Sequence, residues 1–134
     1  MADLDYAFLA DFAKVEANGT LTSVGASFTF LEAAQLPAAH RLSVAGRVRA
    51  LVGETPDLRV DVRGPDDLFR LGVNGPLTHS VNARPYAEGR IGILFALDLQ
   101  VPLPAAGLYS VGIEVDGTEV RRLAFEVART DEVQ

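Results

Sequence analysis

The stretch that decides the fold is residues 105–127, AAGLYSVGIEVDGTEVRRLAFEV. On both sides of its Asp116-Gly117 pair, apolar side chains alternate with polar or small ones, a period of two that is typical of strands with one buried face. Asp-Gly between two such segments favours a type I′ turn, because both residues tolerate positive φ. The stretch therefore predicts a β-hairpin, and its buried face carries Tyr109, Val111, Ile113, Val115, Leu123, Phe125 and Val127.

Tyr109 follows Pro104 and Gly107 near the start of the first of these two strands. In immunoglobulin-like sandwiches, a tyrosine near the start of a late strand buries its ring and ties its hydroxyl to nearby backbone. We expect Tyr109 to form this corner.

The acidic residues around the hairpin tip, Glu114, Asp116 and Glu119, raise the question of a metal site. Calcium takes about six to eight oxygen ligands, usually from several acids at tight spacing, and the chain has no D-x-D-x-D-G run. We interpret the tip as a turn, because loop acids are commonest as turn formers. A looser alternative gathers acids of separate loops at one end of the fold, as in calcium-binding C2-type domains: Glu54, Asp57, Asp66, Asp67 and Asp116.

The same alternation runs through further segments of the chain, namely residues 20–33, 42–52, 58–62 and 90–101. Gly25, in the middle of the first of them, indicates a bulge or a close backbone approach. Turns rich in glycine and proline separate the segments, and no long amphipathic helix is evident. This spacing predicts an all-β fold, an immunoglobulin- or C2-like antiparallel β-sandwich of about seven to nine strands, forming a single domain over residues 1–134.

Charged side chains mark the solvent face of two of these strands. In residues 42–52, whose inward set includes Gly46, Arg47 and Arg49 point outward, and Asp61 does so in the next strand. If the two strands pair, Asp61 lies among several guanidinium groups. Opposite charges across a sheet contribute about 0.2–1 kcal/mol each. We interpret this face as solvated rather than as an arginine-lined ligand face, because exposed charge runs usually are.

The N-terminal segment is apolar on both faces over residues 4–15. Three interpretations stay open: a central strand, a short helix, or an edge strand that buries its outer face in a second protomer. Residues 31–40 are compatible with a helical turn that Pro37 ends.

Composition excludes several classes of protein. With 134 residues and 49% apolar residues, the chain has material for a sizeable core and is not a disordered tail. The net charge of −6, with one lysine against eleven arginines, argues against nucleic-acid binding. Without cysteine there are no disulfides or thiolate sites. The acidic N-terminus and the absence of a long apolar run indicate neither a signal peptide nor a membrane span, so we expect a soluble, cytoplasmic protein.

Catalytic motifs are not found. The two histidines, His40 and His79, lack the spacing of a metal pair. Ser80 is next to His79, but neighbours on a strand point to opposite faces and cannot act as nucleophile and base. No nucleophile elbow, P-loop or dinucleotide fingerprint occurs. We therefore predict no enzymatic activity, no cofactor and no metal.

The remaining candidates are binding residues. Tyr86 lies in a loop between two arginines, and tyrosine and arginine are enriched at binding hot spots. Apolar side chains also occur on both faces of residues 4–15, and Leu94 lies on the otherwise polar face of its strand. We predict a non-enzymatic protein-interaction or assembly module that binds a protein partner or a second copy of itself as a homodimer. The alternative is a small-molecule or carbohydrate-binding module with an Arg/Tyr-lined site that Arg47 and Arg49 extend, although the supply of aromatics is thin. The candidate surface comprises Leu9, Arg84, Tyr86, Arg90 and Leu94.

Three stretches carry a family resemblance: DYAFLADFAKVEANGTLTSVGASFTF, LPAAHRLSVAGRVRA and AAGLYSVGIEVDG. Their order resembles a family of small bacterial proteins of unknown function, whose members open with an Asp-Tyr-Ala segment and close with a Pro-Gly-Tyr-type hairpin. The resemblance spans most of the chain and implies a compact cytoplasmic β-sandwich. Its motifs are structural, so it transfers no active-site residue.

Overall fold

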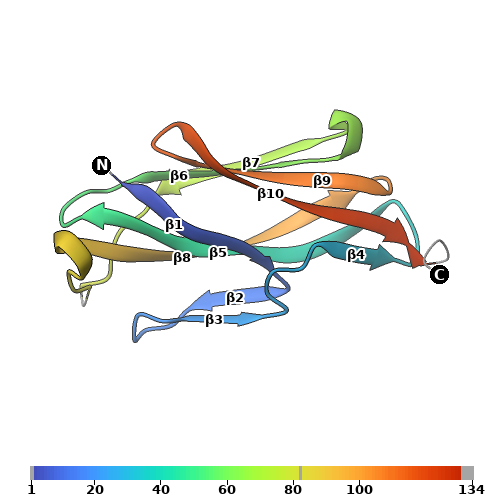
Figure 1. Cartoon of the computed structure of the whole chain (residues 1–134). Helices are drawn as coiled ribbons and strands as arrows, with labels where there is room; N and C mark the ends of the chain where they lie inside the picture. The colour runs from blue at the N-terminus through green and yellow to red at the C-terminus, as the bar shows by residue number, and fades with distance from the viewer. Residues whose placement is uncertain (1, 82, 131–134) are drawn as a thin grey trace.

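Two β-sheets and a separate hairpin make up residues 2–81 and 83–130, which the computed structural model describes (Figure 1). The smaller sheet has the strand order β1 (Asp3–Ala10), β5 (Ala38–Leu51), β8 (Arg90–Leu103). The larger sheet has the order β4 (Phe30–Ala33), β10 (Thr118–Arg129), β9 (Gly107–Val115), β6 (Asp57–Arg63), β7 (Arg70–Pro76). The hairpin pairs β2 (Phe12–Val15) with β3 (Leu21–Val24). Two short 3₁₀ turns, η1 (Pro65–Asp67) and η2 (Ala87–Gly89), complete the described elements.

The prediction of an all-β fold with antiparallel sheets is confirmed. Among the named strands, every paired neighbour is antiparallel except β4 and β10, which run parallel. Ten strands occur in the described residues, more than the sequence predicted. No helix in this part of the chain is long and apolar enough to cross a membrane.

The decisive hairpin forms as predicted between β9 and β10. Val115 faces Thr118 across the turn, and Asp116 and Gly117 have φ of 51° and 85°. The Tyr109 corner is also confirmed: the ring is fully buried, and its hydroxyl donates to the Ala105 carbonyl at 2.7 Å. Burial raises the pKa of the Tyr109 phenol.

The core lies between the two sheets. The predicted inward faces of β6, β8, β9 and β10 supply one continuous apolar cluster, together with β5. Its most buried large side chains are Tyr109, Phe125, Leu42, Ile91 and Ile113. Val52, the last residue of the strand predicted over residues 42–52, is 61% exposed, because β5 ends at Leu51.

The N-terminal segment is an edge strand of the three-stranded sheet, and β1 is followed at once by β2. Leu9 points into the core between the sheets, with 3% of its surface exposed. The other face of β1 packs through Phe8 and Ala10 against the β2–β3 hairpin, which lies outside the smaller sheet in Figure 1. The chain therefore covers this outer face itself within one protomer.

The predicted strand over residues 20–33 is wrong, because the chain breaks in its middle. Gly25 and Ser27 have φ of 63° and 67°, and β3 and β4 enter different sheets. A close approach is present at Gly25, but it is made by a side chain rather than by backbone: a Cβ there would lie 2.2 Å from Asp11 Oδ2. Residues 31–40 form no helical turn. Residues 34–37 bend between β4 and β5, with a cis peptide bond before Pro37.

The pairing of residues 42–52 with 58–62, which was the condition for placing Asp61 among guanidinium groups, does not occur. Strand β5 pairs with β1 and β8, whereas β6 pairs with β7 and β9 in the other sheet. Arg47 and Arg49 therefore lie in a different sheet from Asp61. They bind the carboxylates of β1 instead.

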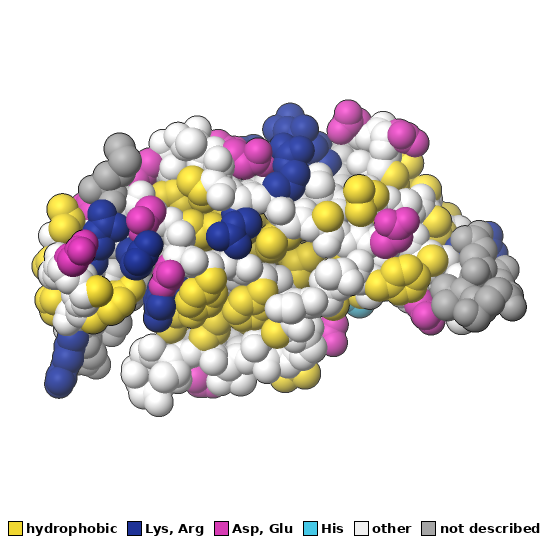
Figure 2. Space-filling model, viewed as in Figure 1, with side chains coloured by type: hydrophobic (Ala, Val, Ile, Leu, Met, Phe, Trp, Pro, Cys, Tyr) yellow, Lys and Arg dark blue, Asp and Glu magenta, His cyan; other side chains and the backbone are white. Residues whose placement is uncertain are grey.

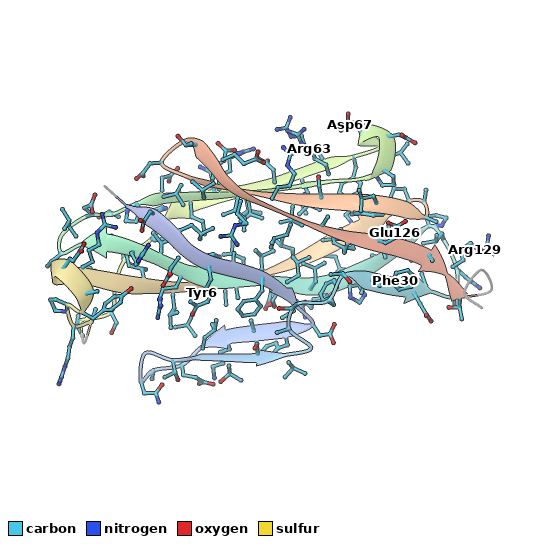
Figure 3. All side chains as sticks on the ribbon, in the orientation of Figure 1. Tyr6, Phe30, Arg63, Asp67, Glu126 and Arg129 are labelled. Atoms are coloured by element: carbon cyan, nitrogen blue, oxygen red, sulfur yellow. The ribbon has the colours of Figure 1, made fainter. Side chains whose placement is uncertain are left out.

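The loop acids do not gather at one end. Asp57 begins β6 and its backbone nitrogen donates to Asp116 Oδ1 at 2.9 Å. Asp66 and Asp67 lie in η1, beyond the other end of β6, where Figure 3 labels Asp67. The C2-like calcium cluster is thus contradicted. Within the described residues, no group of three or more potential ligands is placed to hold a metal ion.

Candidate functional site

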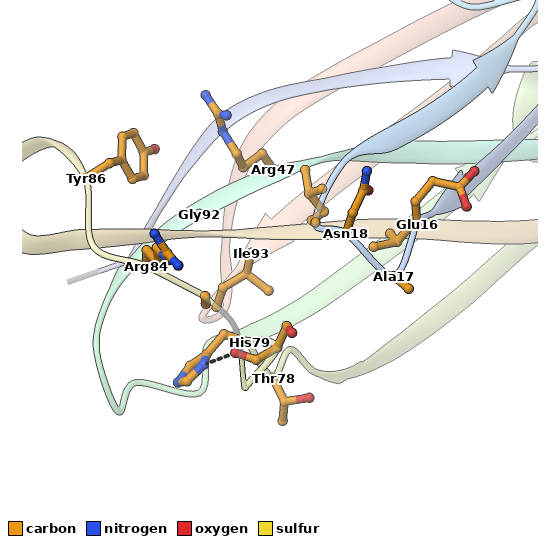
Figure 4. Close-up of a pocket in the computed structure, with 15 residues that line it drawn as sticks. Glu16, Ala17, Asn18, Arg47, Thr78, His79, Arg84, Tyr86, Gly92 and Ile93 are labelled. Carbon is orange, nitrogen blue, oxygen red and sulfur yellow. Dashed lines mark hydrogen bonds between the residues drawn. The ribbon is translucent and has the colours of Figure 1, made fainter.

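An open groove of about 920 Å³ lies on the outer face of the three-stranded sheet. The β2–β3 turn, residues 16–19, forms one wall, and residues 78–80, 83, 84 and 86 form the other. The floor is the outer face of β8 around Gly92 and Leu94. Figure 4 shows Arg84 and Tyr86 on one side and Glu16 and Asn18 on the other.

The β2–β3 turn is held by hydrogen bonds within the hairpin and between the hairpin and the sheet. Asn18 Oδ1 accepts hydrogen bonds from the Thr20 backbone nitrogen at 3.2 Å and from its hydroxyl at 2.7 Å, and the following Gly19 has a φ of 84°. The hairpin is fastened to the sheet by Ser43, whose hydroxyl accepts from the Ala13 nitrogen at 3.1 Å and donates to Asp98 at 2.6 Å. This wall therefore stands independently of any ligand.

Glu16 is the one acidic side chain among the described lining residues of the groove. Its carboxylate accepts a hydrogen bond from the Thr22 hydroxyl at 2.6 Å and lies 3.7 Å from the Lys14 ammonium. The Thr22 hydrogen bond, assisted by Lys14, lowers the pKa of Glu16. The charge of this acid is thus already partly neutralised within the hairpin.

Arg47 is held at the edge of the groove by contacts on several sides. Its Nε donates to Asp5 Oδ2 at 2.8 Å, and the hydrogen bonding to Asp5 raises the pKa of the guanidinium. The same group lies 5.1 Å from the Tyr6 ring centre and 5.6 Å from that of Tyr86. A Cβ on Gly92 would lie 2.8 Å from Arg47 Cδ, so the stem lies across this glycine. Arg47 thereby positions Tyr86.

Three of the five predicted surface residues meet in this groove. Arg84 is exposed and, among the described residues, forms neither an ion pair nor a hydrogen bond through its side chain. Tyr86 is 41% exposed, and its backbone nitrogen donates to the Arg90 carbonyl at 2.7 Å. Leu94 is half-buried in the floor. The arrangement presents a cation, an aromatic ring and an apolar side chain to one space.

The other two predicted residues lie elsewhere. Leu9 belongs to the core and presents no surface, so its place in the candidate interface is corrected. Arg90 does not line the groove and donates from Nη1 to Asp3 Oδ1 at 3.1 Å. Arg49 binds the same carboxylate, with its Nε 3.2 Å from Oδ1. Arg49 and Arg90 therefore tie β1 to the rest of its sheet.

His79 and Ser80 line the groove but not as neighbours on a strand. They lie in the irregular segment after β7, so the argument from strand alternation does not apply to them. The His79 Nδ1 lies 2.9 Å from the Ser80 carbonyl oxygen, a contact to backbone rather than to the hydroxyl.

Sequence reasoning missed the β2–β3 wall, Tyr6 and the role of Gly92. The groove joins segments separated by many residues, and no spacing along the chain signals their meeting. One signal was available: Asn18-Gly19 marks a tight turn, and a turn between two short strands projects from a sheet.

Two sheets around one apolar core, with a groove on the outer face of the smaller sheet, define an all-β protein with a candidate binding surface. The chain belongs to a family of unknown function (DUF6941), whose sequence model matches residues 5–128. The match begins at the Asp-Tyr-Ala segment and confirms the resemblance to such a family. A search of curated proteins gives no match.

Proposed function

We propose that this protein is a non-enzymatic interaction module that binds an acidic segment of a protein partner in the groove. The observation that carries the proposal is the convergence of Arg84, Tyr86 and Leu94 on one concave surface. Arginine and tyrosine dominate binding hot spots because they combine large contact area with directed polar groups. An apolar residue beside them excludes water from the contact.

Charge complementarity supports an acidic occupant. The chain carries a net charge of −6, yet the described lining of the groove has Arg84 and Arg47, which is bonded to Asp5, against Glu16. Glu16 is engaged by Lys14 and Thr22, whereas Arg84 has no partner in the described residues. A carboxylate on the ligand would pair with Arg84, and an adjacent apolar side chain would cover Leu94. Charge-assisted bonds of this kind are the stronger class of hydrogen bond.

The proposed architecture is an immunoglobulin- or C2-like β-sandwich. The Tyr109 corner and the face-to-face sheets favour it. We further propose a cytoplasmic protein, consistent with the acidic composition and the lack of cysteine. Self-association remains part of the proposal at the groove rather than at Leu9.

The test uses two short synthetic peptides, Glu-Leu-Glu-Leu and its uncharged counterpart Gln-Leu-Gln-Leu, both capped at the termini. Each is titrated into the full chain while backbone amide resonances are followed by NMR. We expect saturable shifts at Arg84, Tyr86 and Leu94 with the acidic peptide, and weaker binding by about tenfold with the uncharged one.

The matched variants are Arg84→Glu in the groove and Arg41→Glu, an exposed arginine that does not line it. Arg84→Glu should abolish saturable binding, and Arg41→Glu should leave it unchanged. Equal losses in both variants, or no binding by the wild type, would refute the proposed function.

A second candidate, a small-molecule-binding module, is favoured by the groove volume of about 920 Å³, which falls within the common range for small-ligand sites. Phenylacetate, an aromatic ring bearing a carboxylate, is the probe. Saturable shifts at Arg84 and Tyr86 with phenylacetate but not with the acidic peptide would replace the first candidate by the second.

A further inference from the structure

A second concave surface lies on the outer face of the five-stranded sheet, in the layer opposite the groove. The strand register sets Arg70 of β7, Arg63 of β6 and Ser110 of β9 side by side in one row. All three line a polar dent of about 180 Å³. Figure 2 shows basic side chains gathered at the top of this view, where Figure 3 labels Arg63.

Glycines beside Asp61 leave room for the side chains of Arg59 and Glu119 at the dent. Asp61 faces Gly72 on one neighbouring strand and Gly112 on the other. A Cβ on Gly72 would lie 2.5 Å from Arg59 Nη2, and one on Gly112 would lie 2.6 Å from Glu119 Oε1. Side chains at these two positions would therefore fill the space that Arg59 and Glu119 now occupy.

The acids that line the dent are already paired with arginines of other rows. Asp61, which is 6% exposed, accepts two hydrogen bonds from Arg59, both of 2.9 Å. Arg59 Nε also lies 3.7 Å from Glu114. Glu119 binds Arg122 at 3.0 Å. Arg59 and Arg122 thus offset two of the three negative charges, because Asp61 and Glu114 share Arg59.

The row itself is uncompensated. Among the described residues, the side chains of Arg63, Arg70 and Ser110 form no hydrogen bond or ion pair with one another or with any other group. Like charges directly opposite each other destabilise a sheet. Asp66 and Asp67 lie in the turn between the two strands, but they do not line the dent or pair with either arginine. With Arg59 included, four arginines therefore stand against the three carboxylates around the dent, and Arg63 and Arg70 are the two without a partner among the described residues.

We propose that Arg63, Arg70 and Ser110 form a binding site for the phosphate group of a small molecule. The planar guanidinium presents parallel N–H donors that match phosphate oxygens, and Ser110 adds a hydroxyl donor. The dent is several times larger than the roughly 30 Å³ of a water molecule and too small for a peptide segment. A doubly charged oxyanion between Arg63 and Arg70 removes the repulsion of the row.

The test titrates inorganic phosphate and, separately, glycerol phosphate into the full chain at constant ionic strength. Backbone amide resonances of Arg63, Arg70 and Ser110 report binding by NMR. We expect saturable shifts at these residues, and a loss of affinity of about tenfold in Arg63→Gln and in Arg70→Gln. The control is Arg121→Gln, an exposed arginine that does not line the dent and should keep wild-type affinity.

The outcomes separate the sources of the phosphate group. Equal binding of both probes supports recognition of the phosphate itself, and binding of glycerol phosphate alone supports an ester as ligand. Shifts that sodium chloride reproduces, or equal loss in Arg121→Gln and Arg63→Gln, would overturn the proposal. Arg84→Glu should not change phosphate binding, so the groove and the dent can fail separately. A thermal melt of each variant verifies that it is folded.

Discussion

Gly46 is the position where the packing of β1 on β5 can be tested most directly. A Cβ at this glycine would lie 2.2 Å from the Tyr6 carbonyl oxygen and 2.9 Å from both Ala7 Cα and Phe95 Cζ. Ordinary van der Waals contact begins near 3.4 Å, so Gly46→Ala leaves the contact with Tyr6 about 1 Å too short. The Tyr6 oxygen belongs to backbone and cannot rotate away.

The magnitude follows from what has to move. β1 must back away from β5, which overpacking data place at about 1–3 kcal/mol. Lengthened ladder hydrogen bonds beside Gly46 add about 0.5–1.5 kcal/mol each. We expect Gly46→Ala to lower the free energy of unfolding by about 3 kcal/mol, a large part of the roughly 5–15 kcal/mol typical of a domain. In urea this shifts the midpoint down by about 1–3 M.

Gly75→Ala is the matched control, because Gly75 is also a strand glycine but has no atom within 4 Å of the added Cβ. Here alanine acts mainly on the unfolded chain and should stabilise by up to about 1 kcal/mol. Urea titrations followed by far-UV circular dichroism measure both variants. Midpoints of Gly46→Ala and Gly75→Ala that agree within error would refute the close packing of β1 on β5.

Two further substitutions test the corner and the groove. Tyr109→Phe should cost about 1 kcal/mol in urea titrations, because the hydroxyl no longer donates to the Ala105 carbonyl. Burial raises the pKa of Tyr109 in the folded state, so the stability that the neutral phenol contributes is complete below about pH 10 and is lost as the pH rises further. The free energy of unfolding of Tyr109→Phe should therefore fall less steeply above this pH than that of the wild type. Parallel pH profiles of the two proteins would contradict this. Gly92→Ala should displace the Arg47 stem and so weaken binding of the acidic peptide severalfold. The free energy of unfolding should change by less than about 1 kcal/mol. Unchanged peptide binding by NMR would mean that Arg47 does not position Tyr86.

The hairpin of residues 105–127 could be predicted from sequence because its determinants are local. Period-two alternation sets the buried faces, and Asp116-Gly117 supplies the positive φ of the turn. The Tyr109 corner is local as well, since donor and acceptor are four residues apart.

The break in residues 20–33 could not be predicted in the same way. It depends on the close approach of Asp11 to Gly25 and on the parallel pairing of β4 with β10 near the other end of the chain. Neither contact leaves a pattern in the segment itself. The alternation of apolar residues is therefore preserved across a break that assigns its halves to different sheets.

The candidate site was half predictable for a similar reason. Arg84 and Tyr86 stand out by residue type, but the wall that faces them comes from a turn more than sixty residues earlier in the chain. Leu9 was misplaced because apolar residues occupy both faces of β1, and the pattern does not say which face enters the core. The small residues Ala10, Ala13 and Ala45 instead let the β2–β3 hairpin pack closely on that face.

Both proposed sites contain arginines that lack the partners other arginines of the chain have. The arginines with partners make use of the planar guanidinium: Arg59 binds Asp61 through two nitrogens, and Arg47 lies over two aromatic rings. A lysine could reproduce neither geometry, which gives a physical reason for eleven arginines against one lysine. Exposure alone does not distinguish the remaining arginines, since several are solvated. What distinguishes Arg84 and the Arg63 row is that guanidinium groups without partners among the described residues line concave surfaces, where a ligand can replace water on more than one side.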